Sequence, residues 1–385
     1  MVHHDKSYAV TNALVYTNET LLPNTMVLVE DGVITYVGTY EAALVKDLKQ
    51  FDAEGRLVGP ALVDMHIHGG GGFDLTGGNV QENLEGLALY LEGRGITSFQ
   101  IAIVMDLHLL GQIKAALETS TFLSSYLLGV YVEGPYIASE KKGGIPSSCI
   151  RAYDREYLDK ILAIRFGEKA LVTTMTIAPE LLGSEELSNI LELNNIVAAY
   201  GHSDCPLDAL QPRAKNHLTH LFNAMGGIDH KRPGLAAIPF VSSFSHATYE
   251  LVCDGVHVHP SLLDMTITTV GPSRLCLISD AMSLAGMGPG EGTYLGKKMY
   301  SNGKACYYSS SDILIGSASL ISETAKRLYQ EGLLDRQSFF RVASENPLRV
   351  LSQTDKGKVA PGFRADLVML SDEMDVVEVF KAAFG

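Results

Sequence analysis

The chain has 385 residues, and 46% of them are hydrophobic, so it can bury a large core and has room for one large barrel and a small accessory domain. The formal net charge of −14 leaves no basic stripe to neutralise the phosphates of a nucleic acid, so an anionic substrate must be held by a local pocket. The five cysteines form no C-x-x-C pair, which disfavours a disulfide framework and a zinc ribbon. The N-terminus MVHHDKSYAV does not resemble a signal peptide, and no run of about 18 apolar residues suggests a membrane span. We therefore expect a cytoplasmic protein without nucleic acid or membrane partners.

Both ends of the chain consist of short β-prone runs separated by turns. Residues 1–59 read as short strands separated by turns, including a hairpin signal at Asp31-Gly32. The stretch KGKVAPGFRADLVMLSDEMDVVEVF near the C-terminus also consists of short β-prone runs, broken by Pro361-Gly362. Because the termini of a domain often lie close together, we predict that residues 1–59 and 356–385 form one small β-sandwich domain. Residues 60–355 are left for a catalytic barrel.

Between the two ends, apolar runs alternate with amphipathic helical stretches such as VQENLEGLALYLEGRG. Strands that are buried on both faces read as near-continuous apolar runs, and eight of them separated by helices is the number for a closed parallel barrel. The eight runs are residues 60–68, 96–104, 127–134, 170–180, 195–203, 216–224, 249–257 and 274–282. We therefore predict an α/β fold, a (β/α)8 TIM-like barrel. A doubly wound open sheet is the alternative, since some of the runs are weak.

Polar residues stand at the ends of these predicted strands. The carboxyl ends of the strands in such a barrel meet at one mouth, so residues spread over 200 positions converge there. His66 and His68 alternate along the first strand and can both face the interior, where two imidazoles suit zinc or another first-row divalent ion. The strand-end residues are His66, His68, Glu133, His202, His220, Asp254 and Asp280.

Each of these residues also has a simpler interpretation. A lone histidine such as His202 is more often a satisfied hydrogen-bonding group than a ligand. An unpaired buried carboxylate at Glu133 would be costly, which favours a metal partner. Asp254 precedes Gly255 and could be a turn aspartate. His217 precedes His220 by three residues, on the opposite strand face, and we leave it out of the site.

A set of short motifs carries a resemblance to a known family. The strings DMHIHGGGGFD, VEGPYI…KKGG, GHSD, THLFNAMGG…RPGLA, CDGVHVHP, ISDAM and IGSASLI occur in this order along nearly the whole chain. In order and spacing the sequence resembles the N-acetylglucosamine-6-phosphate deacetylases of the amidohydrolase superfamily. The resemblance implies a distorted β/α barrel with a β-sandwich built from both chain ends. It also implies release of acetate from an amino-sugar phosphate, in amino-sugar catabolism, by a homodimer.

The resemblance also implies roles for the strand-end residues. Glu133, His202 and His220 are expected to hold one divalent ion, and His66 and His68 a second one with Glu133 as a bridge. This gives one or two ions per subunit, of zinc, iron, manganese or cobalt. Asp280 matches the catalytic aspartate, which exchanges a proton with the bound water and the leaving amine, and we count it among the metal ligands. His257 matches the histidine that polarises the acetyl carbonyl.

The chemistry of amide hydrolysis asks for the same groups. A divalent ion lowers the pKa of bound water from about 15.7 to about 7, which makes hydroxide available at neutral pH. The developing oxyanion needs a positive or hydrogen-bond-donating group, such as the metal and His257. One carboxylate can serve as base and then as acid if it reaches both the water and the leaving nitrogen. Asp280 is the best candidate.

The substrate-binding residues that we predict include two departures from the family pattern. Ile145 stands where the family usually has a histidine that contacts the substrate. Lys231, with Arg232 beside it, stands where the family has a phosphate-binding arginine, and lysine binds phosphate as a point charge and not as a bidentate fork. The alternative is that these two residues are a solvated loop pair. The predicted substrate-binding residues are Gly144, Ile145, Asn223, Ala224, Lys231, Asp254, His257, Leu314, Ile315 and Gly316.

Other functions stay open at this point. The substrate could be another N-acetyl amino sugar, galacto-configured or unphosphorylated. A cyclic-amide hydrolase of the same superfamily bridges two metals with a carboxylated lysine, but the fourth apolar run, ALVTTMTIAPE, contains no lysine. A non-catalytic sugar-phosphate sensor is disfavoured by the intact metal set and by Asp280.

Overall fold

The computed structural model describes residues 1–17, 19–213 and 215–382, so the last three residues of the predicted C-terminal segment, 383–385, lie outside the described residues. The chain divides into two compact units. The first unit comprises Met1–Val63, Leu89–Ser98 and Ile321–Gly385, and the second comprises Asp64–Ala88 and Phe99–Leu320. The boundaries that we predicted after residues 59 and 355 stay a prediction.

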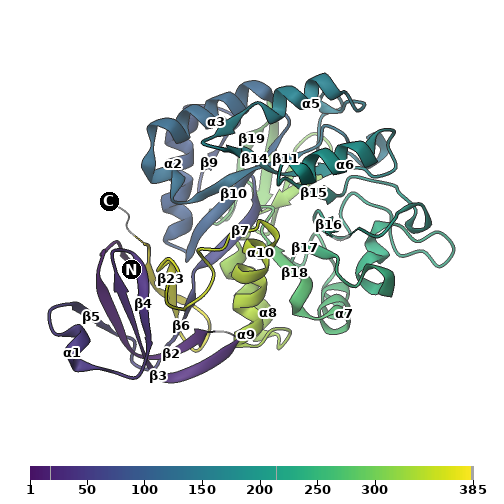
Figure 1. Cartoon of the computed structure of the whole chain (residues 1–385). Helices are drawn as coiled ribbons and strands as arrows, with labels where there is room; N and C mark the ends of the chain where they lie inside the picture. Colours follow the sequence, from purple (N-terminus) through teal and green to yellow (C-terminus); the bar gives the residue numbers. More distant parts are fainter. Residues whose placement is uncertain (18, 214, 383–385) are drawn as a thin grey trace. The chain divides into compact units, whose positions relative to one another are not determined.

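The first unit contains a sheet built from both chain ends (Figure 1, purple and yellow). Its strands run in the order β1-β24-β23-β6-β2-β3-β4, and β5 also pairs with β2. They are β1 (Val2–His3), β2 (Tyr8–Thr17), β3 (Thr20–Glu30), β4 (Val33–Gly38), β5 (Lys49–Asp52), β6 (Leu57–Pro60), β23 (Leu367–Leu370) and β24 (Val376–Phe380). The antiparallel pairing of β6 with β23 joins the two ends of the chain and confirms that they form a separate sheet.

The local sequence explains the turn between β3 and β4 and the packing of one face of this sheet. Asp31 and Gly32 connect β3 to β4 with φ values of 50° and 77°, and positive φ at both positions is what a two-residue hairpin turn of type I′ requires. Alternate apolar residues of β2, β3 and β23 bury one face together with Phe380. The helical segments of the unit are α1 (Ala42–Val45), α8 (Ile321–Gln330), α9 (Arg336–Phe340), a π-helical segment (Arg341–Glu345) and α10 (Asn346–Val350).

The second sheet is a nearly closed barrel of eight parallel strands that follow one another in chain order. They are β7 (Leu62–Ile67), β10 (Ile96–Val104), β11 (Leu127–Glu133), β14 (Val172–Ile177), β15 (Val197–Tyr200), β16 (His217–Leu218), β17 (Thr248–Val252) and β18 (Leu275–Ile278). Each strand coincides with one of the eight predicted apolar runs, and only β17 begins one residue before its run. The C-terminal end of β7 and the segment after β18 are joined by hydrogen bonds from the His68 amide to the Ala281 carbonyl (2.9 Å) and from the Asp280 amide to the His66 carbonyl (3.0 Å). The barrel prediction is therefore confirmed, and the open doubly wound sheet is excluded.

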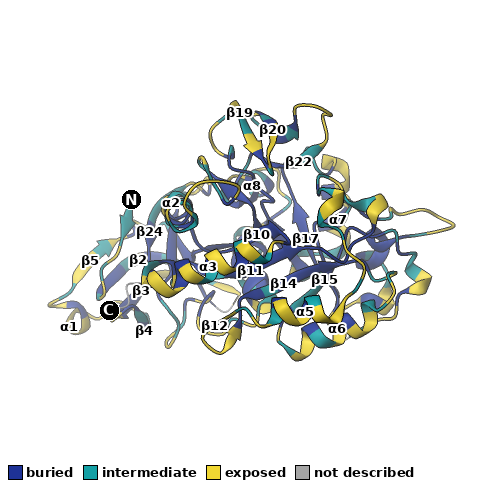
Figure 2. Cartoon of the chain, turned by 90° about the horizontal axis from the view of Figure 1, so that it is seen from above, coloured by how far each residue is buried: buried dark blue, intermediate teal, exposed yellow. Residues whose placement is uncertain are grey.

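Helices pack on the outside of the barrel strands. Figure 2 shows the strands buried, whereas α3, α5 and α6 each turn an exposed side outward. The helices are α2 (Val80–Glu92), α3 (Leu107–Thr119), α4 (Thr121–Ser124), α5 (Arg155–Leu162), α6 (Ser184–Leu193) and α7 (Pro260–Val270). Within the described residues, short 3-10 turns follow β15 and β16 in place of α-helices, among them Leu207–Ala209 and Leu235–Phe240. Irregular loops therefore form the part of the barrel mouth next to β15 and β16.

A four-stranded antiparallel sheet is inserted after β18 and returns the chain to the barrel mouth. Its strands are β19 (Pro289–Tyr294), β20 (Lys297–Asn302), β21 (Ala305–Tyr308) and β22 (Leu314–Ser317). Gly316 permits this return, because a Cβ atom at its position would lie 2.7 Å from the carbonyl oxygen of Asp280. The insert thereby brings Leu314 and Ile315 beside the barrel mouth.

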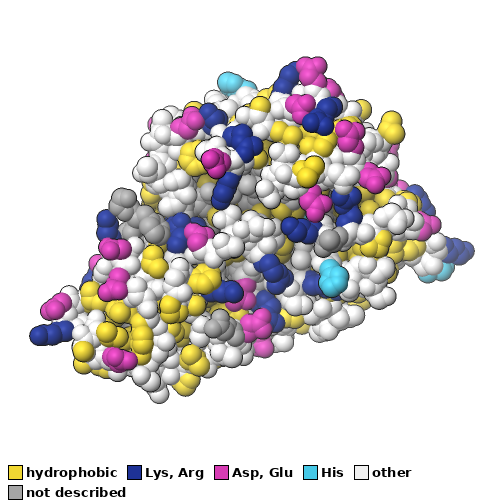
Figure 3. All heavy atoms as spheres, viewed as in Figure 1, with side chains coloured by type: hydrophobic (Ala, Val, Ile, Leu, Met, Phe, Trp, Pro, Cys, Tyr) yellow, Lys and Arg dark blue, Asp and Glu magenta, His cyan; other side chains and the backbone are white. Residues whose placement is uncertain are grey.

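The surface charges and the lengths of the helices bear on possible nucleic-acid and membrane partners. On the face drawn in Figure 3, Lys and Arg side chains are interspersed with Asp and Glu side chains. In the part of the chain that the structure describes, no helix is both long and apolar enough to span a bilayer.

Candidate active site

Three of the predicted site residues follow their strands at the same interval. His202, His220 and Asp280 each stand two residues beyond the last residue of β15, β16 and β18. All three have positive φ values, of 46°, 25° and 50°. Such a backbone costs roughly 1–3 kcal/mol per residue and persists where the surrounding structure over-determines it. The turn at each strand end thus directs a side chain into the centre of the barrel mouth.

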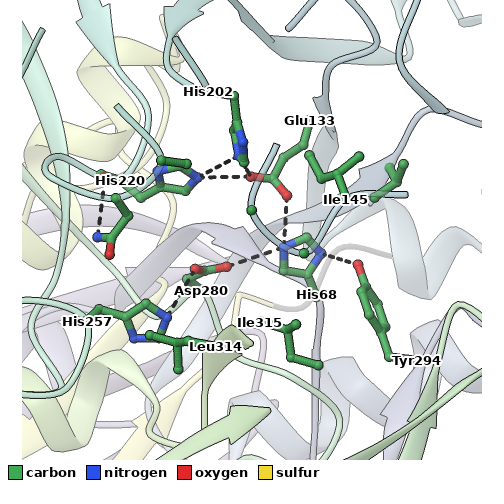
Figure 4. Close-up of a pocket in the computed structure, with 15 residues that line it drawn as sticks. His68, Glu133, Ile145, His202, His220, His257, Asp280, Tyr294, Leu314 and Ile315 are labelled. Carbon is green, nitrogen blue, oxygen red and sulfur yellow. Dashed lines mark hydrogen bonds and ion pairs between the residues drawn. The ribbon is translucent and has the colours of Figure 1, made fainter. Parts of the chain in front are cut away.

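One group of possible metal ligands consists of Glu133, His202 and His220 (Figure 4). The Nε2 atoms of His202 and His220 lie 3.3 Å and 3.1 Å from Glu133 Oε1, and 3.1 Å from each other. The Nδ1 atom of His202 lies 2.8 Å from the Lys141 carbonyl oxygen, which can only accept. The His202 Nδ1 therefore carries a hydrogen, and its Nε2 faces the centre of the group.

A second group consists of His66, His68 and Asp280. The Asp280 Oδ1 atom lies 3.3 Å from His68 Nε2 and 3.8 Å from His66 Nε2. Glu133 reaches this group as well, with Oε2 at 3.4 Å from His68 Nε2 and Oε1 at 3.6 Å from His66 Nε2. Within each group the ligand atoms lie within 4.8 Å of one another. The structure therefore brings all six predicted ligands together and puts Glu133 between the two groups.

The donors fit a divalent cation. The Nε2 atom of His66 is buried and has no hydrogen-bond partner among the described residues. Burial alone would lower the pKa of His68, but Asp280 and Glu133 raise it to about 10. The carboxylates thus favour positive charge between them, and a cation can supply that charge in place of protons. Imidazole and carboxylate are the donor types of zinc and similar ions.

Glu250, in the middle of β17, is a site residue that the sequence did not reveal. Its Oε2 lies 3.0 Å from His66 Nδ1 and accepts a hydrogen bond from the His220 amide (3.1 Å). Its Oε1 lies 3.1 Å from Nε2 of His217, the histidine that we left out of the site. One signal was available, because Glu250 is the one charged residue in the apolar run Tyr249–Cys253.

Tyr294 was also missed, and no sequence signal identified it. It ends the first strand of the inserted sheet, and its hydroxyl lies 3.3 Å from Nδ1 of His68. The insert therefore contributes directly to the surroundings of a predicted ligand.

His257 and Asp254 form a buried pair beside Asp280. Asp254 Oδ1 accepts the Val256 and His257 amides at 2.8 and 2.9 Å, so it does close the turn at Gly255. Its Oδ2 lies 2.6 Å from His257 Nδ1, and His257 Nε2 lies 3.8 Å from Asp280 Oδ2. Burial acts to lower the pKa of His257, but the hydrogen bond and charge of Asp254, and then the charge of Asp280, raise it above its usual range. His257 therefore favours the imidazolium form, in which Nε2 is a donor.

A cavity opens above the two groups, and most of the predicted substrate residues line it. His257, Leu314 and Ile315 lie on one side (Figure 4). Ile145 packs against Val104 and is 5% exposed. The lining residues are His68, Val104, Glu133, Gly143, Gly144, Ile145, His202, His220, Asn223, Ala224, His257, Asp280, Tyr294, Leu314 and Ile315.

Three predicted substrate residues are not among those lining residues. Lys231 lies in an exposed loop, where its amide donates to the Asp229 carboxylate at 2.8 Å. Asp254 lies behind His257, and Gly316 supports the return of β22. Their assignment to substrate binding stays a prediction.

Comparison with known proteins identifies the family. The model of the amidohydrolase family matches residues 57–383. The chain belongs to the amidohydrolase family. It is therefore a hydrolase, and members of this family generally use divalent metal ions.

Two relatives and one solved structure that resemble this chain along most of its length are named as deacetylases of amino-sugar 6-phosphates. The chain is 30% identical to the N-acetylglucosamine-6-phosphate deacetylase of Bacillus subtilis, over 97% of this chain and 95% of that protein. It is 28% identical to the N-acetylgalactosamine-6-phosphate deacetylase of Escherichia coli O157:H7, over 94% and 95%. A mutant N-acetyl-D-glucosamine-6-phosphate deacetylase of Mycobacterium smegmatis, solved in complex with N-acetyl-D-glucosamine-6-phosphate, aligns with a TM-score of 0.85 and 26% identity, over 99% of each chain. The resemblance inferred from the motifs is confirmed.

Proposed function

We propose that this amidohydrolase removes the N-acetyl group of N-acetylglucosamine 6-phosphate and releases glucosamine 6-phosphate and acetate. The observation that carries the proposal is the convergence of both ligand groups, Asp280 and His257 on one cavity. The names of the relatives and of the bound sugar phosphate in the mycobacterial structure support the same substrate.

We propose that the two groups hold one or two divalent ions, of zinc, iron, manganese or cobalt. Glu133, His202 and His220 would hold one ion, and His66, His68 and Asp280 a second, with Glu133 between them. When bound, such an ion lowers the pKa of a water molecule and polarises the substrate carbonyl. The short distances from Glu133 to histidines of both groups support the bridging role.

One of these ligands, Asp280, and the neighbouring His257 would act on the substrate directly. Asp280 accepts a proton from the attacking water and delivers it to the leaving nitrogen, so that one carboxylate acts as base and then as acid. His257 donates from Nε2 to the carbonyl oxygen as negative charge develops there. The 3.8 Å between His257 Nε2 and Asp280 Oδ2 leaves these two groups close enough to act on the same amide.

An acetate-release screen tests the proposal. The four substrates are N-acetylglucosamine, N-acetylgalactosamine and their 6-phosphates, each incubated with enzyme whose metal content has been measured. We expect the highest kcat/KM for N-acetylglucosamine 6-phosphate. Failure to release acetate from any of the four by metal-loaded enzyme would refute the proposal.

The galacto-configured 6-phosphate is the second candidate substrate. The 28% identity to the N-acetylgalactosamine-6-phosphate deacetylase, over nearly the full length of both chains, favours it. A higher kcat/KM for that sugar in the same screen would replace the gluco-configured assignment and leave the reaction unchanged.

Phosphate recognition rests on Lys231 in this proposal. Lys231→Ala should raise KM about tenfold to a hundredfold for the 6-phosphate, because a charge-assisted contact is worth roughly 1.5–3 kcal/mol, and leave KM for the unphosphorylated sugar unchanged. Arg232→Ala is the matched control, since Arg232 Nη1 lies 3.4 Å from an Asp204 carboxylate oxygen and has its own partner. Equal KM changes for both sugars in Lys231→Ala would mean that this lysine shapes the loop and does not bind phosphate.

We further propose a cytoplasmic homodimer, which rests on the motif resemblance and on the absence of a disulfide-type cysteine pattern in the sequence. Light scattering coupled to size exclusion tests the assembly: a mass near twice 41.6 kDa is expected, and a mass of 41.6 kDa would contradict it.

A further inference from the structure

Glu250 contacts one residue of each ligand group, the imidazole of His66 and the backbone amide of His220. It is completely buried, and it comes from β17, whereas the residues it contacts come from β7, from β16 and from the segment after β16. One oxygen meets the imidazole of His66 and the backbone amide of His220, and the other meets the imidazole of His217. Glu250 does not line the cavity, so it cannot contact a substrate held there.

The His220 amide can only donate, so Oε2 of Glu250 acts as an acceptor, and His66 Nδ1 lies 3.0 Å from the same oxygen. This arrangement fits an ionised carboxylate that accepts from the amide and from both imidazoles. The ionised carboxylate therefore fixes the hydrogen of His66 on Nδ1. The lone pair of His66 Nε2 is left facing the second ligand group.

We propose that Glu250 is a positioning residue that holds His66 in the tautomer and ring orientation needed to bind the second metal ion. The inference rests on the proposed metal loading of the two groups. A hydrogen bond from a carboxylate to the far nitrogen of a metal-binding histidine fixes its tautomer and raises its basicity, and loss of such a partner typically weakens metal binding about 10–100-fold.

The contacts predict an unequal effect on the two ions. Glu250 holds the ring of His66, but it holds His220 only through the backbone amide. Among the described residues it makes no hydrogen bond or ion pair with the ring of His202 or the carboxylate of Glu133. Glu133, His202 and His220 should therefore keep their ion when Glu250 is changed. The ion bound by His66, His68 and Asp280 should be weakened.

Glu250→Gln is the informative substitution. It preserves the size of the side chain, but it removes the charge of the carboxylate, so an amide oxygen facing His66 Nδ1 is a weaker acceptor than the carboxylate oxygen it replaces. Equilibrium dialysis of the full chain against Zn²⁺ alone should give two ions per chain for the wild type. In Glu250→Gln one ion should bind with unchanged affinity and the other about 10–100-fold more weakly.

Two variants separate positioning from general destabilisation. Asp366→Asn changes another buried carboxylate, which accepts from Lys381 Nζ at 3.0 Å in the first unit, and it should lower the melting temperature without changing Zn²⁺ binding. In a His66→Ala background, Glu250→Gln should cause no further loss of Zn²⁺, because its effect is transmitted through His66. Loss of both ions in Glu250→Gln, binding of both ions at wild-type affinity, or a further loss in the double variant would each overturn the proposal.

A measurement on the wild-type chain does not depend on how well a variant folds. With ¹⁵N-labelled histidine and Zn²⁺ bound, NMR should show His66 carrying its hydrogen on Nδ1, with that N–H signal lost in His66→Ala. A His66 signal with the hydrogen on Nε2 would overturn the proposal, as would a wild-type chain that binds one Zn²⁺ and keeps it in His66→Ala. None of these readouts uses the sugar, so wild-type enzyme that binds two Zn²⁺ but releases no acetate would refute the proposed function alone.

Discussion

Asp254→Asn is the substitution that most directly tests how His257 acts. Asparagine keeps the oxygen that accepts the Val256 and His257 amides at 2.8 and 2.9 Å, so the turn at Gly255 should survive. It removes the negative charge 2.6 Å from His257 Nδ1. The NH2 group of the asparagine then faces His257 Nδ1 and cannot accept its hydrogen, so the imidazolium of His257 should lose a charge-assisted hydrogen bond worth roughly 1.5–3 kcal/mol. This corresponds to about a tenfold to hundredfold lower kcat/KM when His257 must donate to the carbonyl oxygen as the imidazolium.

The pH profile supplies a second readout with a definite sign. Asp254 raises the pKa of His257, so removal of its charge should lower that pKa. The alkaline fall in kcat/KM, where His257 loses its proton, should then begin at lower pH in the variant than in the wild type. The difference in kcat/KM between the variant and the wild type should decrease as the pH falls, because His257 is then protonated in both enzymes. Acetate release from N-acetylglucosamine 6-phosphate, followed between pH 5.5 and 9, measures this difference.

The matched control is Asp154→Asn. Asp154 accepts the Glu156 and Tyr157 amides at 3.0 and 3.4 Å where α5 begins, in the same pattern as Asp254 but without an imidazole. Its kcat/KM and pH profile should equal those of the wild type. If Asp254→Asn lowers kcat/KM by the same factor at every pH, the aspartate only holds the turn and the argument about the charge of His257 is refuted.

Three further predictions concern the proton carrier, the metal and the thiols. Asp280→Asn should lower kcat for acetate release by about 10²–10⁴ because an amide cannot accept the proton, and a variant that keeps more than about a tenth of the activity would disprove the assignment. Dialysis against a chelator should abolish acetate release and lower the melting temperature, because a ligand present at 100 times its Kd stabilises the fold by about 2.7 kcal/mol. Added Zn²⁺ should restore both the activity and the melting temperature. An unchanged melting temperature would argue against a bound ion. Burial raises the pKa of Cys205 to about 11 and that of Cys306 to about 12, whereas Cys149 is partly exposed. Iodoacetamide at pH 8 should therefore modify Cys149 first, as followed by peptide mass spectrometry. Modification of Cys306 at the same rate would contradict this prediction.

The sequence by itself determined the barrel and the identity of the six candidate ligands. Strands buried on both faces must be apolar along their whole length, so a polar residue at the end of each one stands out. The residues that are recognisable for this reason are His66, His68, Glu133, His202, His220 and Asp280. The two chain ends were also predictable as one sheet, because their short β-prone runs contrast with the long apolar runs between them.

Only the tertiary structure decided how these ligands are held. The contact between His66 and Glu250 joins residues 184 positions apart, and in the sequence Glu250 is a single charge inside an apolar strand, without a visible partner. Tyr294 reaches His68 because the inserted sheet folds back over the barrel mouth, and no local pattern encodes that path. Strand periodicity fixes which face of a strand a side chain occupies, but the distance between two strand ends depends on the register and closure of the whole barrel. The partners that orient the ligands therefore emerge only when the barrel closes.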